Sequence, residues 1–158
     1  MSLRQVATLQ HANQVTVPAS RSECGVAEAA VVDTHALIFH AAASGRLGAR
    51  ARVHLQACEQ RRGIAYIPTP VMWECSLLAR AVRINLHRST RAFFDDLFSN
   101  PAYQPVDLTP NHVLLADELR FTRDPFDALI VAVARDLSLP LITRDAAIRA
   151  SGAVSVLW

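Results

Sequence analysis

The chain contains no lysine: all sixteen basic residues among its 158 are arginine. P-loop nucleotide binding, Schiff-base chemistry and catalysis by a lysine general base all require the missing side chain, so these classes are excluded. Arginine remains available for phosphate, which its planar guanidinium binds with two parallel hydrogen bonds. A formal net charge of +2 is too small by itself to indicate a nucleic-acid partner.

Cysteine is scarce as well. Cys24, Cys58 and Cys75 are odd in number and form no Cys-x-x-Cys pair, which favours a reducing compartment over a disulfide scaffold. His54 and Cys58 have the i, i+4 spacing of one helix face, but no two further ligands follow at a zinc-site spacing. We therefore interpret this pair as ordinary helix packing and expect any metal site elsewhere.

Long uninterrupted apolar runs are absent. The longest, residues 26–43, is broken by Glu28, Asp33, His35 and His40, and it falls short of the ~18 uncharged residues of a membrane-spanning helix. The first residues also lack the apolar core of a signal peptide. We expect no membrane association, a cytoplasmic location and, at this length, one soluble domain with a single core.

Short apolar strands alternate with helical stretches along most of the chain. Residues 1–28 show mixed polarity and no sustained period, which predicts a loosely ordered extension before a domain at 29–158. Strands are predicted for Ala-Ala-Val-Val before Asp33 and for residues 64–67, 104–108, 139–142 and 154–157. Helices are predicted at residues 35–43, 48–62, 70–83, 90–99, 110–119, 125–137 and 145–150. This alternation predicts an α/β fold with a central, mostly parallel sheet and helices on both faces.

Two aspartates follow predicted strands. Asp33 ends the first strand, and Asp145 follows the strand at residues 139–142 in the sequence Thr143-Arg144-Asp145. Ligands of parallel sheets bind beyond the carboxyl ends of the strands, so these acids are candidates for a site. Each one alone is equally well explained as the N-cap of the following helix, and Arg144 alone as a surface residue.

Glu74 lies on an apolar stripe. Val71, Cys75, Leu78 and Val82 repeat at the i, i+4, i+7 and i+11 spacing of one helix face, and Glu74 falls on that face. A carboxylate that faces the core costs several kcal/mol unless it is paired or metal-bound. The alternatives are an ion pair with a buried arginine and a place at the edge of the stripe.

The sequence Asp124-Pro125-Phe126-Asp127 is typical of a helix start, with Asp124 as the N-cap and Pro125 at the first helical position. Capping explains Asp124. Asp127 differs, because Ile130, Val131 and Ala134 continue its face into the most apolar helix of the chain. We expect the core side of this helix to carry the Asp127 carboxylate.

One α/β topology can bring these acids to one end of its sheet. Four or five clustered carboxylates repel one another strongly unless a divalent cation lies between them. Oxygen ligands without cysteine or a histidine cluster indicate magnesium or manganese. Such ions commonly share phosphate oxygens of a substrate, so phosphodiester hydrolysis is the predicted chemistry. Whether one or two ions bind stays open.

Taken together, the motifs resemble those of PIN-domain proteins, most closely the VapC-type toxins, over about residues 30–158. The segments that carry the resemblance are Val32-Asp33-Thr34-His35-Ala36-Leu37, Trp73-Glu74, Asp124-Pro125-Phe126-Asp127-Ala128-Leu129-Ile130, Thr143-Arg144-Asp145 and the terminal Val-Leu-Trp.

The resemblance implies a magnesium- or manganese-dependent endoribonuclease. Its acidic pocket matches Asp33, Glu74, Asp127 and Asp145 as catalytic and metal-binding residues, with Asp124 close by. Thr34 and Thr143 match hydroxyl positions that orient the acids or a metal-bound water. An RNA substrate, a cognate antitoxin that blocks the site and a homodimer are also implied. The extension before Ala29 is longer than the family usually carries.

Other functions fit the residues less well. A metal-free ribonuclease with His35 and His40 as acid and base places the two rings on different faces of one helix. A HAD-type phosphatase needs a second aspartate where His35 stands, and a phospho-receiver needs a lysine. The remaining alternative is a catalytically inactive PIN fold that only binds protein or RNA partners, although all four matched positions are acidic.

Arginines at residues 46, 50, 52, 61, 62, 80, 83, 88 and 91 could border the acidic pocket and contact RNA phosphates. Solvated helix faces and helix C-terminal charges explain them equally well.

Overall fold

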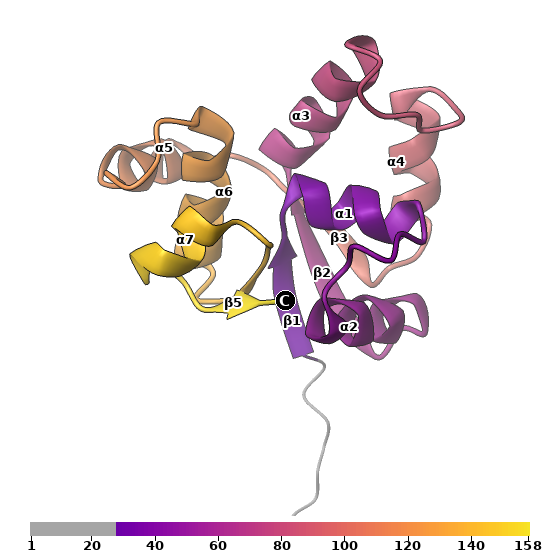
Figure 1. The fold of residues 1–158 in the computed structure, drawn as a ribbon, viewed down its shortest axis with the longest axis horizontal. Coiled ribbons are helices and arrows are strands. Elements are labelled where there is room, and N and C mark those ends of the chain that lie inside the picture. The colour runs from indigo at the N-terminus through magenta and orange to yellow at the C-terminus, as the bar shows by residue number, and fades with distance from the viewer. Residues whose placement is uncertain (1–27) are drawn as a thin grey trace, which may run out of the picture.

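The computed structural model describes residues 28–158 (Figure 1). In this part of the chain five strands form one sheet in the order β3-β2-β1-β4-β5, and every neighbouring pair is parallel. Helices cover both faces of the sheet (Figure 1). The predicted α/β architecture is therefore confirmed, whereas the predicted extension lies outside the described residues except for Glu28.

The secondary structure follows the predicted order throughout. The strands are β1 (Glu28–Val32), β2 (Gly63–Pro68), β3 (Tyr103–Val106), β4 (Leu141–Ile142) and β5 (Val156–Leu157). The helices are α1 (Thr34–Ala41), α2 (Ala49–Glu59), α3 (Thr69–Arg80), α4 (Thr90–Phe98), α5 (Pro110–Asp117), α6 (Pro125–Asp136) and α7 (Ala146–Ser151). Only the element ends differ from the prediction, by up to a few residues, as expected where helices and strands fray.

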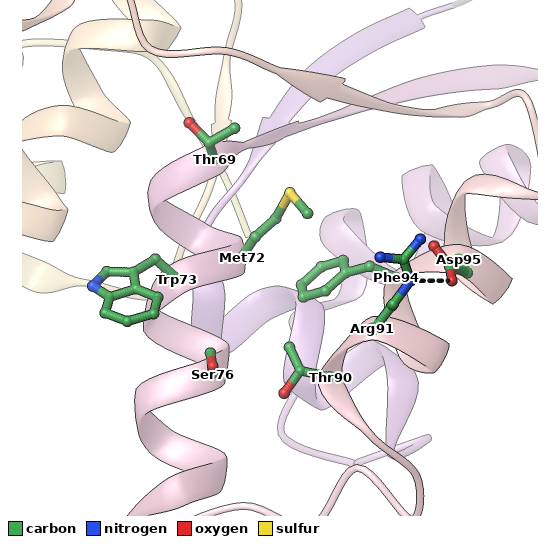
Figure 2. Close-up of a pocket in the computed structure, with 8 residues that line it drawn as sticks. All are labelled: Thr69, Met72, Trp73, Ser76, Thr90, Arg91, Phe94 and Asp95. Carbon is green, nitrogen blue, oxygen red and sulfur yellow. Dashed lines mark ion pairs between the residues drawn. The ribbon is translucent and has the colours of Figure 1, made fainter.

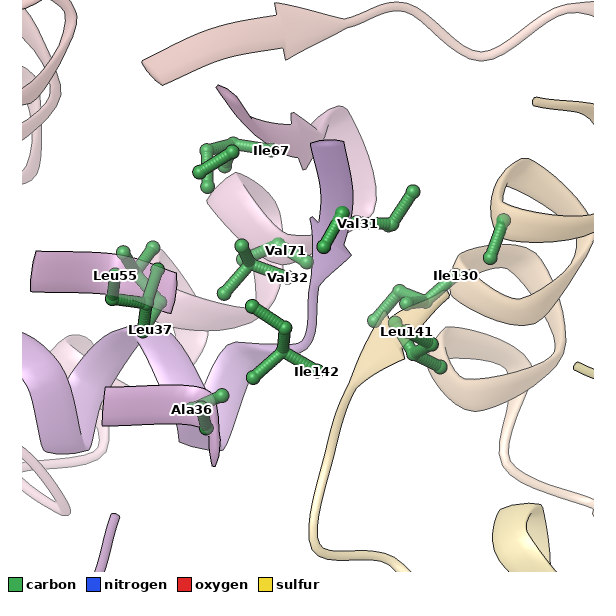
Figure 3. Close-up of a cluster of buried hydrophobic side chains, with 14 of the residues drawn as sticks. Val31, Val32, Ala36, Leu37, Leu55, Ile67, Val71, Ile130, Leu141 and Ile142 are labelled. Carbon is green, nitrogen blue, oxygen red and sulfur yellow. The ribbon is translucent and has the colours of Figure 1, made fainter. Parts of the chain in front are cut away.

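Strand β1 lies at the centre of the sheet and is buried on both faces. Val31 and Val32 are fully buried, and they point to opposite sides because successive strand residues alternate. Figure 3 shows Val32 on the side of Leu37, and Val31 on the side of Ile130 and Leu141. An apolar run in a parallel sheet covered by helices on both faces explains this burial. The carboxyl end of β1 therefore lies at the middle of the edge where all five parallel strands end.

Helix α3 is shorter than predicted. It ends at Arg80, and Val82, expected on the apolar stripe, is 88% exposed and has a positive φ of 56°. Val71 and Cys75 are fully buried and Leu78 is partly buried. The stripe is thus confirmed for its first turns and wrong at its C-terminal end, because the chain leaves the helical conformation before Val82.

Two packing predictions are confirmed. Residues 130–134 of α6 are all buried, as expected for a helix that is apolar nearly all round. In α2 the His54 Nε2 donates to the Ile64 carbonyl oxygen at 3.1 Å, and Cys58 is buried with a free thiol. In the part of the chain that the structure describes, no helix is long and apolar enough to cross a membrane.

Candidate active site

Five carboxylates line one cavity at the carboxyl ends of the central strands. The cavity has a volume of about 310 Å³, and its lining residues are Asp33, His35, Glu74, Asp124, Asp127, Arg144, Asp145 and Ala146. They come from the ends of β1 and β4, from α3 and from the starts of α1, α6 and α7. The structure thus brings together all four acids predicted as catalytic, with Asp124 beside them.

Asp33 is held by the neighbouring strand. Its backbone N–H donates to the Ile142 carbonyl oxygen at 3.1 Å, and its carboxylate accepts a 2.7 Å hydrogen bond from the Thr143 hydroxyl. The side chain is only 6% exposed. Asp33 occupies the N-cap position of α1, but its side chain makes no capping hydrogen bond. The capping interpretation is therefore wrong for Asp33, because Thr143 turns the carboxylate toward β4.

Glu74 is fixed in a similar way from another helix. The Thr34 hydroxyl donates to Glu74 Oε2 at 2.5 Å, and Thr34 is fully buried at the start of α1. The hydrogen bond joins α1 to α3 beside the end of β1. Both threonine hydroxyls named by the resemblance therefore contact a site carboxylate directly.

Asp145 has a capping role as well as a place in the cavity. Its carboxylate accepts from the Ile148 N–H at 2.8 Å and caps α7, and its own N–H donates to the Thr143 hydroxyl oxygen at 3.1 Å. The capping interpretation is confirmed for this residue. Because one carboxylate oxygen accounts for that bond, the other remains available to the cavity.

The sequence Thr-Arg-Asp occurs twice, and in both copies the threonine hydroxyl accepts from the aspartate N–H and the aspartate carboxylate caps the next helix. The Thr122 hydroxyl oxygen accepts from the Asp124 N–H at 3.0 Å, and the Asp124 carboxylate caps α6 by accepting from the Phe126 N–H at 2.8 Å. Thr122 also donates to Asp127 Oδ2 at 3.4 Å. Thr122 was not among the site residues predicted from the sequence. Its signal was the repeat of Thr143-Arg144-Asp145 as Thr122-Arg123-Asp124.

Burial and mutual repulsion disfavour the charged forms of these acids. Burial raises the pKa of Asp127 to about 7, and the carboxylates of Asp124, Asp33, Asp145 and Glu74 contribute to that rise in decreasing order. Burial also raises the pKa of Asp33 and of Glu74, and the hydrogen bonds from Thr143 and Thr34 oppose that rise. Such clustered shifts are typical of functional sites. A bound cation would remove the repulsion that the fold maintains here.

The donor set suits magnesium or manganese. Among residues 28–158 no three His, Cys, Asp or Glu side chains converge closely enough to form a ready-made metal cage. Mg²⁺ keeps several of its waters, and proteins usually hold it through one or two carboxylates together with substrate phosphates. Carboxylates that line a small cavity, with two of them fixed by threonine hydroxyls, fit that mode of binding.

The basic residues near the cavity differ from those considered in the sequence. Arg144 lines it, whereas none of the nine arginines at residues 46–91 does. His35 also lines the cavity, but His40 lies elsewhere, with its Nε2 3.0 Å from the Tyr103 hydroxyl and 3.2 Å from Glu59. The two histidines therefore form no acid–base pair.

A second and larger hollow lies between α3 and α4 (Figure 2). It has a volume of about 530 Å³ and is lined by Thr69, Met72, Trp73, Ser76, Thr90, Arg91, Phe94 and Asp95. Trp73 is 50% exposed, and the Arg80 guanidinium lies 5.1 Å from its ring centroid. The two charged residues that line this hollow, Arg91 and Asp95, form an exposed ion pair at 3.4 Å. This α3–α4 groove therefore lacks the buried polar groups that chemistry requires.

Comparison with known proteins gives a family model and several solved structures. The family model described as PIN domain matches residues 30–152. VapBC2 from Rickettsia felis, bound to a promoter DNA fragment, has a TM-score of 0.58 at 13% identity and covers 81% of this chain and 96% of its own. A toxin–antitoxin complex from Klebsiella pneumoniae has a TM-score of 0.55 at 23% identity, with 79% and 94% covered.

FitAcB from Neisseria gonorrhoeae has a TM-score of 0.56 at 16% identity and covers 81% of this chain and 96% of its own. No curated protein matches the sequence. These identities are low, so the solved structures show a shared fold. The family model spans most of the chain, from the middle of β1 to the end of α7. The chain belongs to the PIN domain family.

Proposed function

We propose that this protein is a magnesium- or manganese-dependent endoribonuclease and the toxin of a toxin–antitoxin pair. The observation that carries the proposal is the convergence of Asp33, Glu74, Asp127 and Asp145 on one cavity, with raised pKa values for three of them. PIN domains are generally nucleases that use divalent metals. A phosphodiester is therefore the substrate class that this site fits.

Each site residue has a distinct task in this proposal. Thr143 and Thr34 hold the carboxylates of Asp33 and Glu74 in place, which lowers the entropy lost when a metal binds. When bound, the cation activates water and neutralises charge on the scissile phosphate. Asp127 and Asp145 add two further carboxylates to the cavity that would hold the cation.

The decisive experiment is cleavage of single-stranded RNA by the purified protein. We expect cleavage with magnesium or manganese, and the products should carry 5'-phosphates. In EDTA we expect no cleavage, because the chemistry depends on a cation held by the carboxylates. DNA of the same sequence is the control for the sugar. Undiminished cleavage in EDTA would reject the metal mechanism. Binding without cleavage under all metal conditions would instead support the inactive PIN-fold alternative.

The partners are proposed on structural likeness. The similar structure from Klebsiella pneumoniae is a toxin–antitoxin complex, and we expect a small antitoxin encoded beside this gene to cover the acidic cavity. We also expect the toxin to form a homodimer. Co-expression followed by size-exclusion chromatography tests both: one complex without ribonuclease activity supports them, and separate elution with full activity contradicts the antitoxin.

A further inference from the structure

Two arginines lie over one aromatic ring, and one of them, Arg144, lines the acidic cavity. The guanidinium carbon of Arg144 is 5.0 Å from the centroid of the Phe39 ring, and that of Arg46 is 5.9 Å from it. Both arginines are exposed, whereas Phe39 is only 8% exposed in α1. A cation near an aromatic ring is attracted by the negative charge of the ring face. Phe39 therefore limits where the two charged groups can lie.

The backbone holds Arg144 from both sides. Thr143 before it is fully buried and donates to Asp33, and Asp145 after it caps α7. The Arg144 side chain thus leaves the chain at a fixed point and lines the cavity.

Arg144 also lacks the partner that its surroundings would suggest. Within the described residues 28–158 it shares the cavity with five carboxylates, but it forms no ion pair with any of them. In the same part of the chain no carboxylate pairs with Arg46 either. A guanidinium that packs on a ring keeps its N–H donors for another acceptor.

The charge of the cavity indicates which acceptor the two guanidinium groups would bind. A site of five carboxylates repels a polyanion, and metal ions counter that repulsion only where they bind. The neighbouring phosphates of a substrate strand need a separate positive contact. Arg144 lines the cavity, whereas Arg46 contacts the same Phe39 ring from outside the cavity. The two arginines therefore place positive charge both at the carboxylates and beyond them. Planar guanidinium groups are well suited to bind phosphate oxygens in pairs.

We infer that Arg144 and Arg46, oriented by Phe39, form a phosphate-binding subsite that holds the RNA backbone beside the phosphodiester to be cleaved. This inference rests on the proposed ribonuclease function and adds a binding role for residues outside the carboxylate set.

The test measures RNA binding rather than cleavage. Fluorescence anisotropy of a fluorescein-labelled single-stranded RNA is recorded in EDTA over a series of salt concentrations, with the RNA checked on a gel. For the full-length Arg144→Gln and Arg46→Gln proteins we expect weaker binding. The slope of log affinity against log salt should fall by about 0.7 for each arginine that no longer neutralises a phosphate. The double variant should show about twice the decrease in slope.

Arg149→Gln is the matched control, because Arg149 is an exposed arginine of nearby α7 and lies outside the Phe39 contacts. It removes the same charge and should keep the wild-type slope. Arg144→Lys should keep the slope but bind more weakly, since lysine retains the charge and loses the planar pair of donors. Thermal melts check that each variant folds, and the lost contact with Phe39 should lower the melting temperature of the Arg144 and Arg46 variants only slightly.

The outcomes separate this subsite from the proposed function. If wild type and Arg144→Gln bind RNA with the same slope, or wild type binds no RNA, the subsite is rejected even when metal-dependent cleavage is observed. If the slope decreases for Arg144→Gln and not for Arg149→Gln, the subsite stands even when no metal supports cleavage.

Discussion

The acidic cavity and the α3–α4 groove share one helix and differ in nearly every property. Glu74 of α3 lines the cavity, and its neighbour Trp73 lines the groove. The groove is larger, about 530 Å³ against about 310 Å³, and Met72, Trp73 and Phe94 give it an apolar surface. The cavity, by contrast, contains three carboxylates with raised pKa values.

This difference shows that size alone is a poor guide to chemistry. Adjacent residues of a helix point about 100° apart, so one element can present a carboxylate to one surface and an aromatic ring to another. A site for catalysis is recognised by buried polar groups whose charged forms are disfavoured. We therefore expect substitutions in the two regions to separate activity from stability.

The largest expected effect is on cleavage. Asp33→Asn removes a buried carboxylate that lines the cavity and accepts a hydrogen bond from Thr143. Loss of a metal-binding carboxylate removes several kcal/mol of transition-state stabilisation, so we expect a fall in kcat/KM of about 100-fold or more. Arg91→Gln, which removes an exposed ion pair in the groove, should leave kcat/KM unchanged. A comparable loss in both variants would show that the groove takes part in catalysis.

The sequence predicted the fold well because its signals are local. Strong apolar strands such as β1, and helix starts marked by Pro70, Pro110 and Pro125, need no knowledge of tertiary contacts. The end of α3 was predicted too late, because an apolar residue such as Val82 fits the helical period and still lies outside the helix. Where a helix stops is decided by the path of the following chain.

The second effect concerns stability. Thr143 is fully buried, donates to Asp33 and accepts from the Asp145 N–H. Thr143→Val keeps the shape and removes both hydrogen bonds, so we expect the free energy of unfolding to fall by about 2 kcal/mol. Thr90→Val, a substitution of the same kind in the groove, should change it by less than about 0.5 kcal/mol. Urea denaturation of both variants measures the difference, and equal losses would contradict the assigned role of the Thr143 hydroxyl.

The residues of the site could be predicted from the sequence better than the hydrogen bonds between them. The four acids could be named because they follow strands or interrupt apolar faces. That Asp33 does not cap α1 could not be read from the sequence, because its partner Thr143 is brought close only by the pairing of β1 with β4. The Arg46 and Arg144 contacts with Phe39 likewise depend on loops that meet in three dimensions.

The third prediction uses the sign of a pKa shift. Asp127 has a folded-state pKa of about 7, above the ~3.9 of an unfolded chain, so the folded protein binds the proton more tightly. Its contribution to stability is full below about pH 4 and is lost as pH rises through 7. In EDTA at pH 8, Asp127→Asn should therefore raise the free energy of unfolding by about 1 kcal/mol, a figure reduced for solvent screening at this half-buried group. The melting temperature should rise accordingly.

Bound metal should reverse the order of the two melting temperatures. With manganese, wild type gains binding free energy that the variant lacks, so its melting temperature should rise more. Asp95→Asn, an exposed acid of the groove, is the control and should respond to manganese as wild type does. If Asp127 were only a helix residue, Asn would weaken its interaction with the α6 dipole and lower the melting temperature in EDTA. Melts at pH 4 and pH 8, with EDTA and with manganese, distinguish the two cases.

The smallest predicted effect concerns Arg80, which packs on Trp73 of the groove. Arg80 lies in the last turn of α3, where a positive charge is favourable, and its guanidinium is 5.1 Å from the Trp73 ring centroid. Arg80→Gln should lower the free energy of unfolding by about 0.5–1 kcal/mol. Arg83→Gln, an exposed arginine beyond the end of α3, should have a smaller effect. Both changes should be the same in EDTA and in manganese, because neither arginine lines the acidic cavity. A loss at Arg80 that depended on manganese would show that α3 couples the groove to the cavity and that the two regions are not independent.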